Sequence, residues 1–169
     1  MRKFVLLLAT MFAMTIGVVL PAAASTPASF TLTSGTLSIS APTAAISLGT
    51  QVASTTASTM SGSLGTVVIS DQRGGPTTWT ASVISTAFTP TGGPADPASN
   101  VSYAAGPIVE SGPVVATAYG VTDLEGVVTV VTGVSTGIST ATWSPTISIV
   151  VPANFAPGNY TATITSSVA

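Results

Sequence analysis

Hydrophobic and polar residues alternate in several stretches of this chain after residue 24. The period-two positions are Phe30 and Leu32 in 29–34, Leu37 and Ile39 in 35–40, Trp79, Ala81 and Val83 in 78–83, Trp143, Ile147, Ile149 and Val151 in 142–151, and Tyr160, Ala162, Ile164 and Val168 in 159–168. A period of two puts one face of a β-strand against a core and leaves the other face to solvent. No stretch after residue 24 has a convincing 3.6-residue period, so the pattern predicts strands and no helices.

Clusters of Gly and Pro separate these segments, at 71–77, 89–100, 111–113 and 152–159. Such residues supply the backbone angles that turns require. Short strands with turns between them, and no helices to cover a parallel sheet, predict an all-β fold, a single antiparallel β-sandwich. We expect one domain over residues 25–169, in which the Ser/Thr-rich stretch 50–63 is the weakest segment and forms a surface loop. Disorder is the rival interpretation, but disordered chains lack regularly spaced β-branched and aromatic residues.

The first 24 residues have a different pattern. Arg2 and Lys3 precede an apolar run over residues 4–20, and small residues follow up to Ala24. This is the layout of a secretory signal peptide, so we expect cleavage after Ala24 and a protein that is secreted, extracellular or associated with the cell wall. A retained membrane anchor is the alternative, but the apolar run reaches only the lower limit for a span.

Few residues after Ala24 carry charge. Ser and Thr make up 49 of these 145 residues, and Arg73 is the only base against five acids, a net charge of −4. Nucleic acid and an acidic membrane surface are therefore not expected partners, because a protein needs several cationic side chains to bind either of them. The chain has no Cys and no His, and no Lys after residue 24. We therefore expect no disulfide, no catalytic triad, no zinc site and no cofactor, and the prediction is that the protein is not an enzyme.

Five side chains are candidates for binding: Asp71, Arg73, Trp79, Trp143 and Tyr160. The indoles and the phenol can stack on a sugar, but each also lies in phase with an alternating apolar face, which favours a place in the core. Asp71 and Arg73 precede a Gly-Gly-Pro turn. The pair either fixes that turn or offers a polar contact to a ligand, and we favour the first interpretation.

Asp123 and Glu125 fall on one side of a predicted strand. Calcium needs six to eight oxygen ligands, and nothing nearby supplies more charged ones. We therefore expect two solvated acids at a sheet edge, where charge discourages edge-to-edge aggregation, and no metal site.

Three stretches in order carry a family resemblance: 61–88, with an Asp-x-Arg-Gly turn before a strand that opens on Trp79, then 141–152, and then 156–169 at the C-terminus. Together with the opening 30–42 they resemble the WxL-like domain of secreted Gram-positive surface proteins. The chain is similar to a divergent member, because Trp79 is followed by Thr80 and Ala81, and Ser166 stands about where a second Trp is expected. The resemblance implies a β-rich domain that associates non-covalently with the cell wall, through peptidoglycan.

Two functions follow as expectations. In the first, the protein binds cell-wall glycan (peptidoglycan) through neutral polar and aromatic contacts, because a negative chain has no long-range attraction to a negative wall. In the second, it is an assembly subunit or adhesin-like module that binds other surface proteins through a sheet edge.

Overall fold

The computed structural model describes residues 25–169, so the signal peptide expected over residues 1–24 lies outside the described residues. The chain divides into two units, Met1–Leu32 and Thr33–Ala169. All described strands belong to the second unit, and residues 25–32 form no helix or strand. Among the described residues, no helix is long and apolar enough to cross a membrane.

Strands make up almost all the regular structure of residues 33–169. In chain order they are β1 (Leu37–Ser40), β2 (Ser58–Ser63), β3 (Val67–Asp71), β4 (Thr77–Ser85), β5 (Thr89–Pro90), β6 (Val101–Ala104), β7 (Ile108–Ser111), β8 (Val114–Ala118), β9 (Gly120–Thr122), β10 (Val128–Ser135), β11 (Ser139–Trp143), β12 (Thr146–Val151), β13 (Tyr160–Thr161) and β14 (Ile164–Val168). A 3₁₀ turn, η1 (Ala98–Asn100), precedes β6. Every strand pairing is antiparallel.

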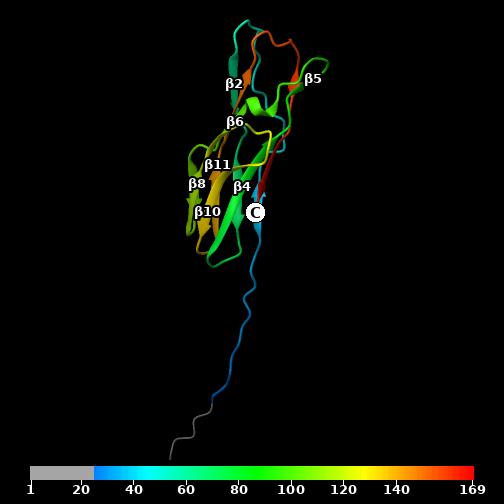
Figure 1. Cartoon of the computed structure of the whole chain (residues 1–169). Coiled ribbons are helices and arrows are strands. Elements are labelled where there is room, and N and C mark those ends of the chain that lie inside the picture. Colours follow the sequence, from blue (N-terminus) through cyan, green and yellow to red (C-terminus); the bar gives the residue numbers. More distant parts are fainter. Residues whose placement is uncertain (1–24) are drawn as a thin grey trace, which may run out of the picture. The chain divides into compact units, whose positions relative to one another are not determined.

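Two four-stranded sheets pack against each other as a β-sandwich (Figure 1). Sheet I has the order β1-β3-β11-β7, and sheet II has the order β14-β4-β10-β8. β1 lies against β14 along one side of the sandwich, and β7 lies against β8 along the other. Buried side chains from both sheets belong to one hydrophobic core. The predicted all-β fold, an antiparallel sandwich, is confirmed.

A third sheet, sheet III (β2-β12-β6-β9), continues sheet I along its strands. β2 leads into β3, β11 into β12 and β6 into β7, so three strands of sheet I have extensions in sheet III. The break falls at residues 64–66 and 144–145, where Leu64 N donates to Pro145 O at 2.9 Å. Pro145 has no N–H to give to the ladder, which explains why the paired strands are interrupted there.

Burial alternates in the strands as the sequence predicts. In β4 the side chains of Trp79, Ala81 and Val83 are buried, while Thr80 and Ser82 between them are only partly buried. This alternation is the physical link between the sequence pattern and the sandwich, because the inward residues of sheets I and II belong to one shared core.

Two predictions about single segments are wrong. Residues 29–34 form no strand, and Phe30 and Leu32 are 91% and 89% exposed. Residues 58–63 lie in the stretch expected to be a loop but form β2, which pairs along its length with β12. Hydroxyl side chains tolerate a strand well, and the pairing comes from a partner far away in sequence, so the local pattern gives little sign of it.

The two longest predicted strands are each two strands. Residues 142–151 contain the end of β11 and all of β12, which lie in different sheets on either side of Pro145. Residues 159–168 contain β13, which pairs with β5, and β14, which pairs with β4. Burial still alternates through both breaks, so the period-two pattern located the inward face correctly but missed the interruptions.

Candidate functional site

The Asp71–Arg73 pair lies where β3 turns toward β4. The Asp71 carboxylate is 1% exposed, and Arg73 binds it with two side-chain N–H groups, Nε to Oδ1 and Nη2 to Oδ2, both at 2.9 Å. The backbone N–H of Arg73 (3.1 Å) and the Thr77 hydroxyl (2.8 Å) also donate to it. Hydrogen bonds from the Arg73 side chain hold the pKa of the Asp71 carboxyl far below its usual range, against the opposing effect of burial.

These contacts tie the two ends of the turn together. Arg73 Nη2 also donates to the Thr78 carbonyl at 2.9 Å, and Gly74 and Gly75 between them both have positive φ angles, of 71° and 69°. Two consecutive residues in that region are costly for any residue with a Cβ. The arrangement supports the turn-fixing interpretation, because the carboxylate is fully occupied and enclosed.

Both indoles lie inside the sandwich. Trp79 and Trp143 are each 2% exposed. The Trp79 ring packs on Gly133 of β10 so closely that any Cβ there would overlap the ring, and its Nε1 has no hydrogen-bond partner among the described residues. Trp143 Nε1 donates to the Tyr103 hydroxyl at 2.9 Å, and burial raises the pKa of Tyr103. Neither indole offers a face to a sugar on the surface.

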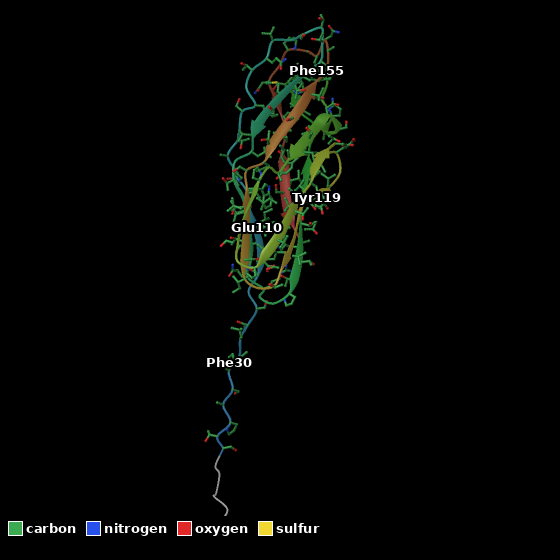
Figure 2. The ribbon with its side chains drawn as sticks, turned by 90° about the vertical axis from the view of Figure 1, so that its left-hand side faces the viewer. Phe30, Glu110, Tyr119 and Phe155 are labelled. Atoms are coloured by element: carbon green, nitrogen blue, oxygen red, sulfur yellow. The ribbon has the colours of Figure 1, made fainter. Side chains whose placement is uncertain are left out.

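Tyr160 is the one candidate that lines a cavity. Its hydroxyl donates to the Ala156 carbonyl at 2.8 Å, and its ring packs on Phe155 with the two centroids 5.0 Å apart. Phe155 lies at the end of the unit that holds this cavity, well away from Glu110 (Figure 2). The phenol is therefore held in place by its own turn at the wall of the cavity.

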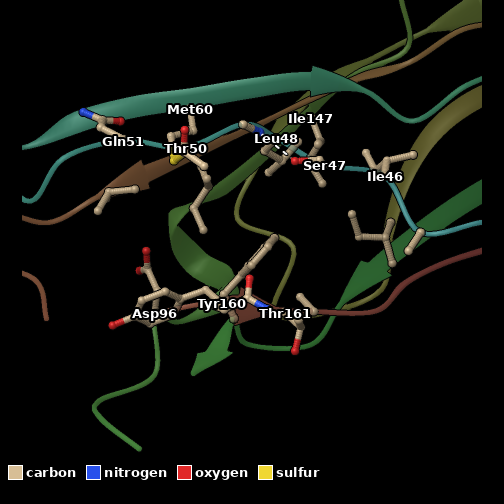
Figure 3. A pocket seen from close by; sticks show the side chains of 18 of the residues that line it. Ile46, Ser47, Leu48, Thr50, Gln51, Met60, Asp96, Ile147, Tyr160 and Thr161 are labelled. Atoms are coloured by element: carbon tan, nitrogen blue, oxygen red, sulfur yellow. Dashed lines mark hydrogen bonds between the residues drawn. The ribbon is translucent and has the colours of Figure 1, made fainter. Parts of the chain in front are cut away.

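The cavity has a volume of about 940 Å³ and lies between sheet III, β14 and two irregular stretches of chain. One of these is residues 41–57, called here the covering segment, and the other is residues 152–159, which follow β12. Figure 3 shows the covering segment running beside β2 on one side of the cavity, with Asp96 and Tyr160 on the other. Apolar side chains dominate the lining, among them Leu48, Met60, Phe88, Ile147, Ile149 and Phe155.

Asp96 is a buried acid in the lining of this cavity, and it is 2% exposed. Two reciprocal backbone hydrogen bonds with Phe88 fix the backbone of Asp96, and the Asn100 amide donates to the Asp96 Oδ1 at 2.6 Å. Burial raises the pKa of Asp96, and the hydrogen bond from Asn100 opposes the rise. Asp96 is not among the residues predicted from the sequence, because a single acid in a Gly/Pro-rich loop carries no pattern.

Replacing Asp96 with Asn is expected to raise the unfolding free energy at pH 7. Because the folded-state pKa of Asp96 lies above its unfolded value, the wild type loses stability as pH rises from about 4 toward that folded-state pKa. The neutral amide keeps an acceptor for Asn100 and removes this loss. Urea denaturation of both proteins at several pH values between 3 and 8 measures it. A variant that is less stable at pH 7, with the wild-type pH dependence, would contradict the assignment.

The outer face of sheet II carries aligned rows of hydroxyl groups. Strand register puts Thr132 beside both Thr117 and Thr80, and puts Ser82 beside both Thr129 and Ser167. A register shift in β10 between Thr129 and Val131 keeps both threonines of that strand on the outside, while Val130 and Val131 are buried. None of the four strands contains a charged residue. The face is therefore uncharged, with hydroxyls at strand and residue spacing and with two exposed valines, Val115 and Val134, paired beside them.

Asp123 and Glu125 do not share the side of a strand, and that prediction is wrong. β9 ends at Thr122, and Asp123 has a φ of 74° and accepts a hydrogen bond from Glu125 N at 2.9 Å. Leu124 between them is fully buried, which is why the chain turns here. Within residues 25–169, no three His, Cys, Asp or Glu side chains come together in a group that could hold a metal.

Comparison of the chain with family models, with curated proteins and with solved structures gives no match. The fold and the faces described above are therefore the basis for assigning a function.

Proposed function

We propose that this is a non-catalytic, secreted cell-surface protein that binds cell-wall glycan (peptidoglycan) through neutral polar contacts on the outer face of sheet II. The observation that supports it best is the pair of hydroxyl rows through Thr132 and Ser82, which have no charged neighbour in their strands. Hydroxyl groups both donate and accept, which suits the hydroxyl and amide groups of a wall glycan. The ordered resemblance to WxL-like domains supports the same partner.

The buried indoles change the chemistry of this proposal. Trp79 and Trp143 have no exposed ring face, so stacking on sugar at this face is left to Tyr119, which is 44% exposed and whose hydroxyl lies 3.3 Å from that of Thr132. Binding then depends on many weak neutral hydrogen bonds, each with a net contribution of about 0.5–1.5 kcal/mol. A non-catalytic role fits the absence of His and Cys, and the enclosure of Asp71 and Asp96.

Sedimentation with purified peptidoglycan is expected to survive 1 M sodium chloride, because neutral contacts are not screened as ion pairs are. The double variant T80V/T132V removes two hydroxyls with little change in shape and is expected to weaken binding roughly tenfold. T140V/T142V, on the outer face of sheet I, is the matched control. Loss of binding in salt, or an equal effect of both variants, would contradict the proposal.

A second candidate function is association with other surface proteins through a sheet edge. β8 is the last strand of sheet II, and the Glu110 side chain accepts from the N–H of Ala116 on its free edge. β2 is the last strand of sheet III, and one of its edges is paired with β12. The free edge of β2, a strand without charged residues, suits the addition of a strand from a partner, whereas on β8 the Glu110 carboxylate already occupies one N–H of the edge.

A further inference from the structure

Residues 25–32 carry an unused strand pattern. Phe30 and Leu32 alternate with Ser29, Thr31 and Thr33, and both apolar side chains are about nine-tenths exposed, at 91% and 89%. The segment contains no charged residue and forms no strand in its own chain. Large apolar side chains at this spacing gain free energy when they enter an apolar site on one side of an added strand.

The covering segment, residues 41–57, is only weakly attached to the rest of the domain along one side of the cavity. Among the described residues, one backbone–backbone hydrogen bond joins this segment to the rest of the chain, in which Asn154 N donates to Ser54 O at 2.7 Å. Leu48 packs against Gly62 of β2, but Val52 is 87% exposed and Ile46 is 42% exposed. A segment with few buried contacts and few backbone bonds opens at low free-energy cost. When it opens, the free edge of β2 and the apolar cavity become accessible together.

The start of the unit Thr33–Ala169 and its cavity lie at opposite ends of the unit, which favours a contact between two copies of the chain. The unit begins beside the turn between β3 and β4, where Ser34 Oγ donates to the Arg73 carbonyl at 2.7 Å and Gly35 N donates to Gln72 O at 3.0 Å. That turn lies at one end of the sandwich, and β2 and β5, which flank the cavity region, lie at the other end (Figure 1). A contact from the start of one copy to the far end of the next is head-to-tail, and such contacts extend into filaments unless they close a ring.

We propose that residues 28–32 of one copy add as a strand along the free edge of β2 in a second copy. Phe30 and Leu32 then enter the cavity that the covering segment flanks in the single chain. Met60 of β2 faces the same cavity and is the nearest strand residue for the inserted side chains to contact. This inference rests on the second candidate function, assembly through a sheet edge, and is independent of glycan binding.

Sedimentation velocity of the chain that starts at residue 25 tests the proposal. The wild type is expected to form larger species as concentration rises from micromolar to millimolar, and F30D/L32D is expected to stay monomeric because a charge cannot enter the apolar cavity. T31D adds a charge on the opposite side of the same segment and is expected to assemble like the wild type. A monomeric wild type throughout, or equal assembly of F30D/L32D, would overturn the proposal.

Cross-linking gives a second readout that does not depend on a destabilised variant, since the chain has no Cys. M60C is mixed under a mild oxidant with F30C or with L32C, and a mixed disulfide dimer identified by mass is expected with at least one of them. S61C, on the exposed side of β2, is the matched control and is expected to give none. Absence of the M60C dimer in both mixtures would reject the proposal.

Peptidoglycan sedimentation of the wild type and of F30D/L32D separates this inference from the main proposed function. If both proteins bind glycan and the wild type does not assemble, the strand insertion alone is rejected. Assembly with no glycan binding would reject the glycan proposal and leave the insertion standing.

Discussion

Truncation of Trp79 to alanine lowers the free energy of unfolding by about 3–5 kcal/mol, the range for large aromatic side chains removed from a core. Trp79 is 2% exposed and packs against Gly133 in the neighbouring strand β10. Because Gly133 has no side chain, it cannot fill the space that the removed indole leaves. A domain of this size has a total stability of about 5–15 kcal/mol, so the loss is a large share of the whole. Urea denaturation followed by circular dichroism measures the change.

Tyr119→Ala is the matched control for this prediction. Tyr119 is also a large aromatic residue next to sheet II, but it is 44% exposed, and its hydroxyl lies 3.3 Å from the Thr132 hydroxyl at the surface. Its truncation is expected to cost about 1 kcal/mol or less, as surface substitutions generally do. Equal losses for the two variants would show that Trp79 is not a core residue.

Replacement of Asp71 with Asn is expected to lower the free energy of unfolding at pH 7 by about 2–3 kcal/mol. Loss of one partner from a buried ion pair costs about 3–5 kcal/mol, and the 30% exposure of the Arg73 side chain lets water offset part of that. The amide can no longer accept all four hydrogen bonds that the carboxylate accepts. The turn between β3 and β4 is then expected to loosen.

The pH dependence of Asp71→Asn distinguishes the ion pair from simple packing. Because the pKa of Asp71 is held below its unfolded value, the carboxylate stabilises the fold fully above about pH 4, and that stabilisation is lost as pH falls through the folded-state pKa. The gap in unfolding free energy between wild type and variant should therefore narrow below pH 4. Glu125→Gln, at an exposed site, is the control for the substitution itself and is expected to change the free energy of unfolding at pH 7 by no more than about 0.5 kcal/mol. A gap that is constant from pH 7 to pH 2 would contradict the role given to the charge.

The inward face of the sandwich could be predicted from the sequence because it depends on local alternation. Trp79, Ala81 and Val83 on β4, and Trp143 with Ile147, were placed on apolar faces by their spacing, and all five are buried. Burial on one side of a strand imposes a period of two whatever the partner strand is. The role of Asp71 and Arg73 at a turn was also open to prediction, because the pair directly precedes Gly-Gly-Pro.

The cavity and its buried acid could not be predicted in this way. The lining combines the covering segment, β2, β12 and the stretch after β12, which are brought together only by sheet pairing. Asp96 is positioned by its backbone bridge to Phe88, and neither residue lies in an alternating segment. The strand pattern around Phe30 had the opposite problem. The alternation is present, but a strand also needs a partner strand, so a local rule predicted a strand that residues 29–34 do not form.

Quenching of tryptophan fluorescence by iodide tests the central claim most directly, because the account requires that both indoles stabilise the sandwich and that neither binds glycan. Both rings are enclosed by sheets I and II. The expected result is a blue-shifted emission that iodide barely quenches in the native protein and quenches strongly after unfolding. A red-shifted emission that iodide quenches readily in the native protein would mean that an indole lies at the surface, and it would contradict the account.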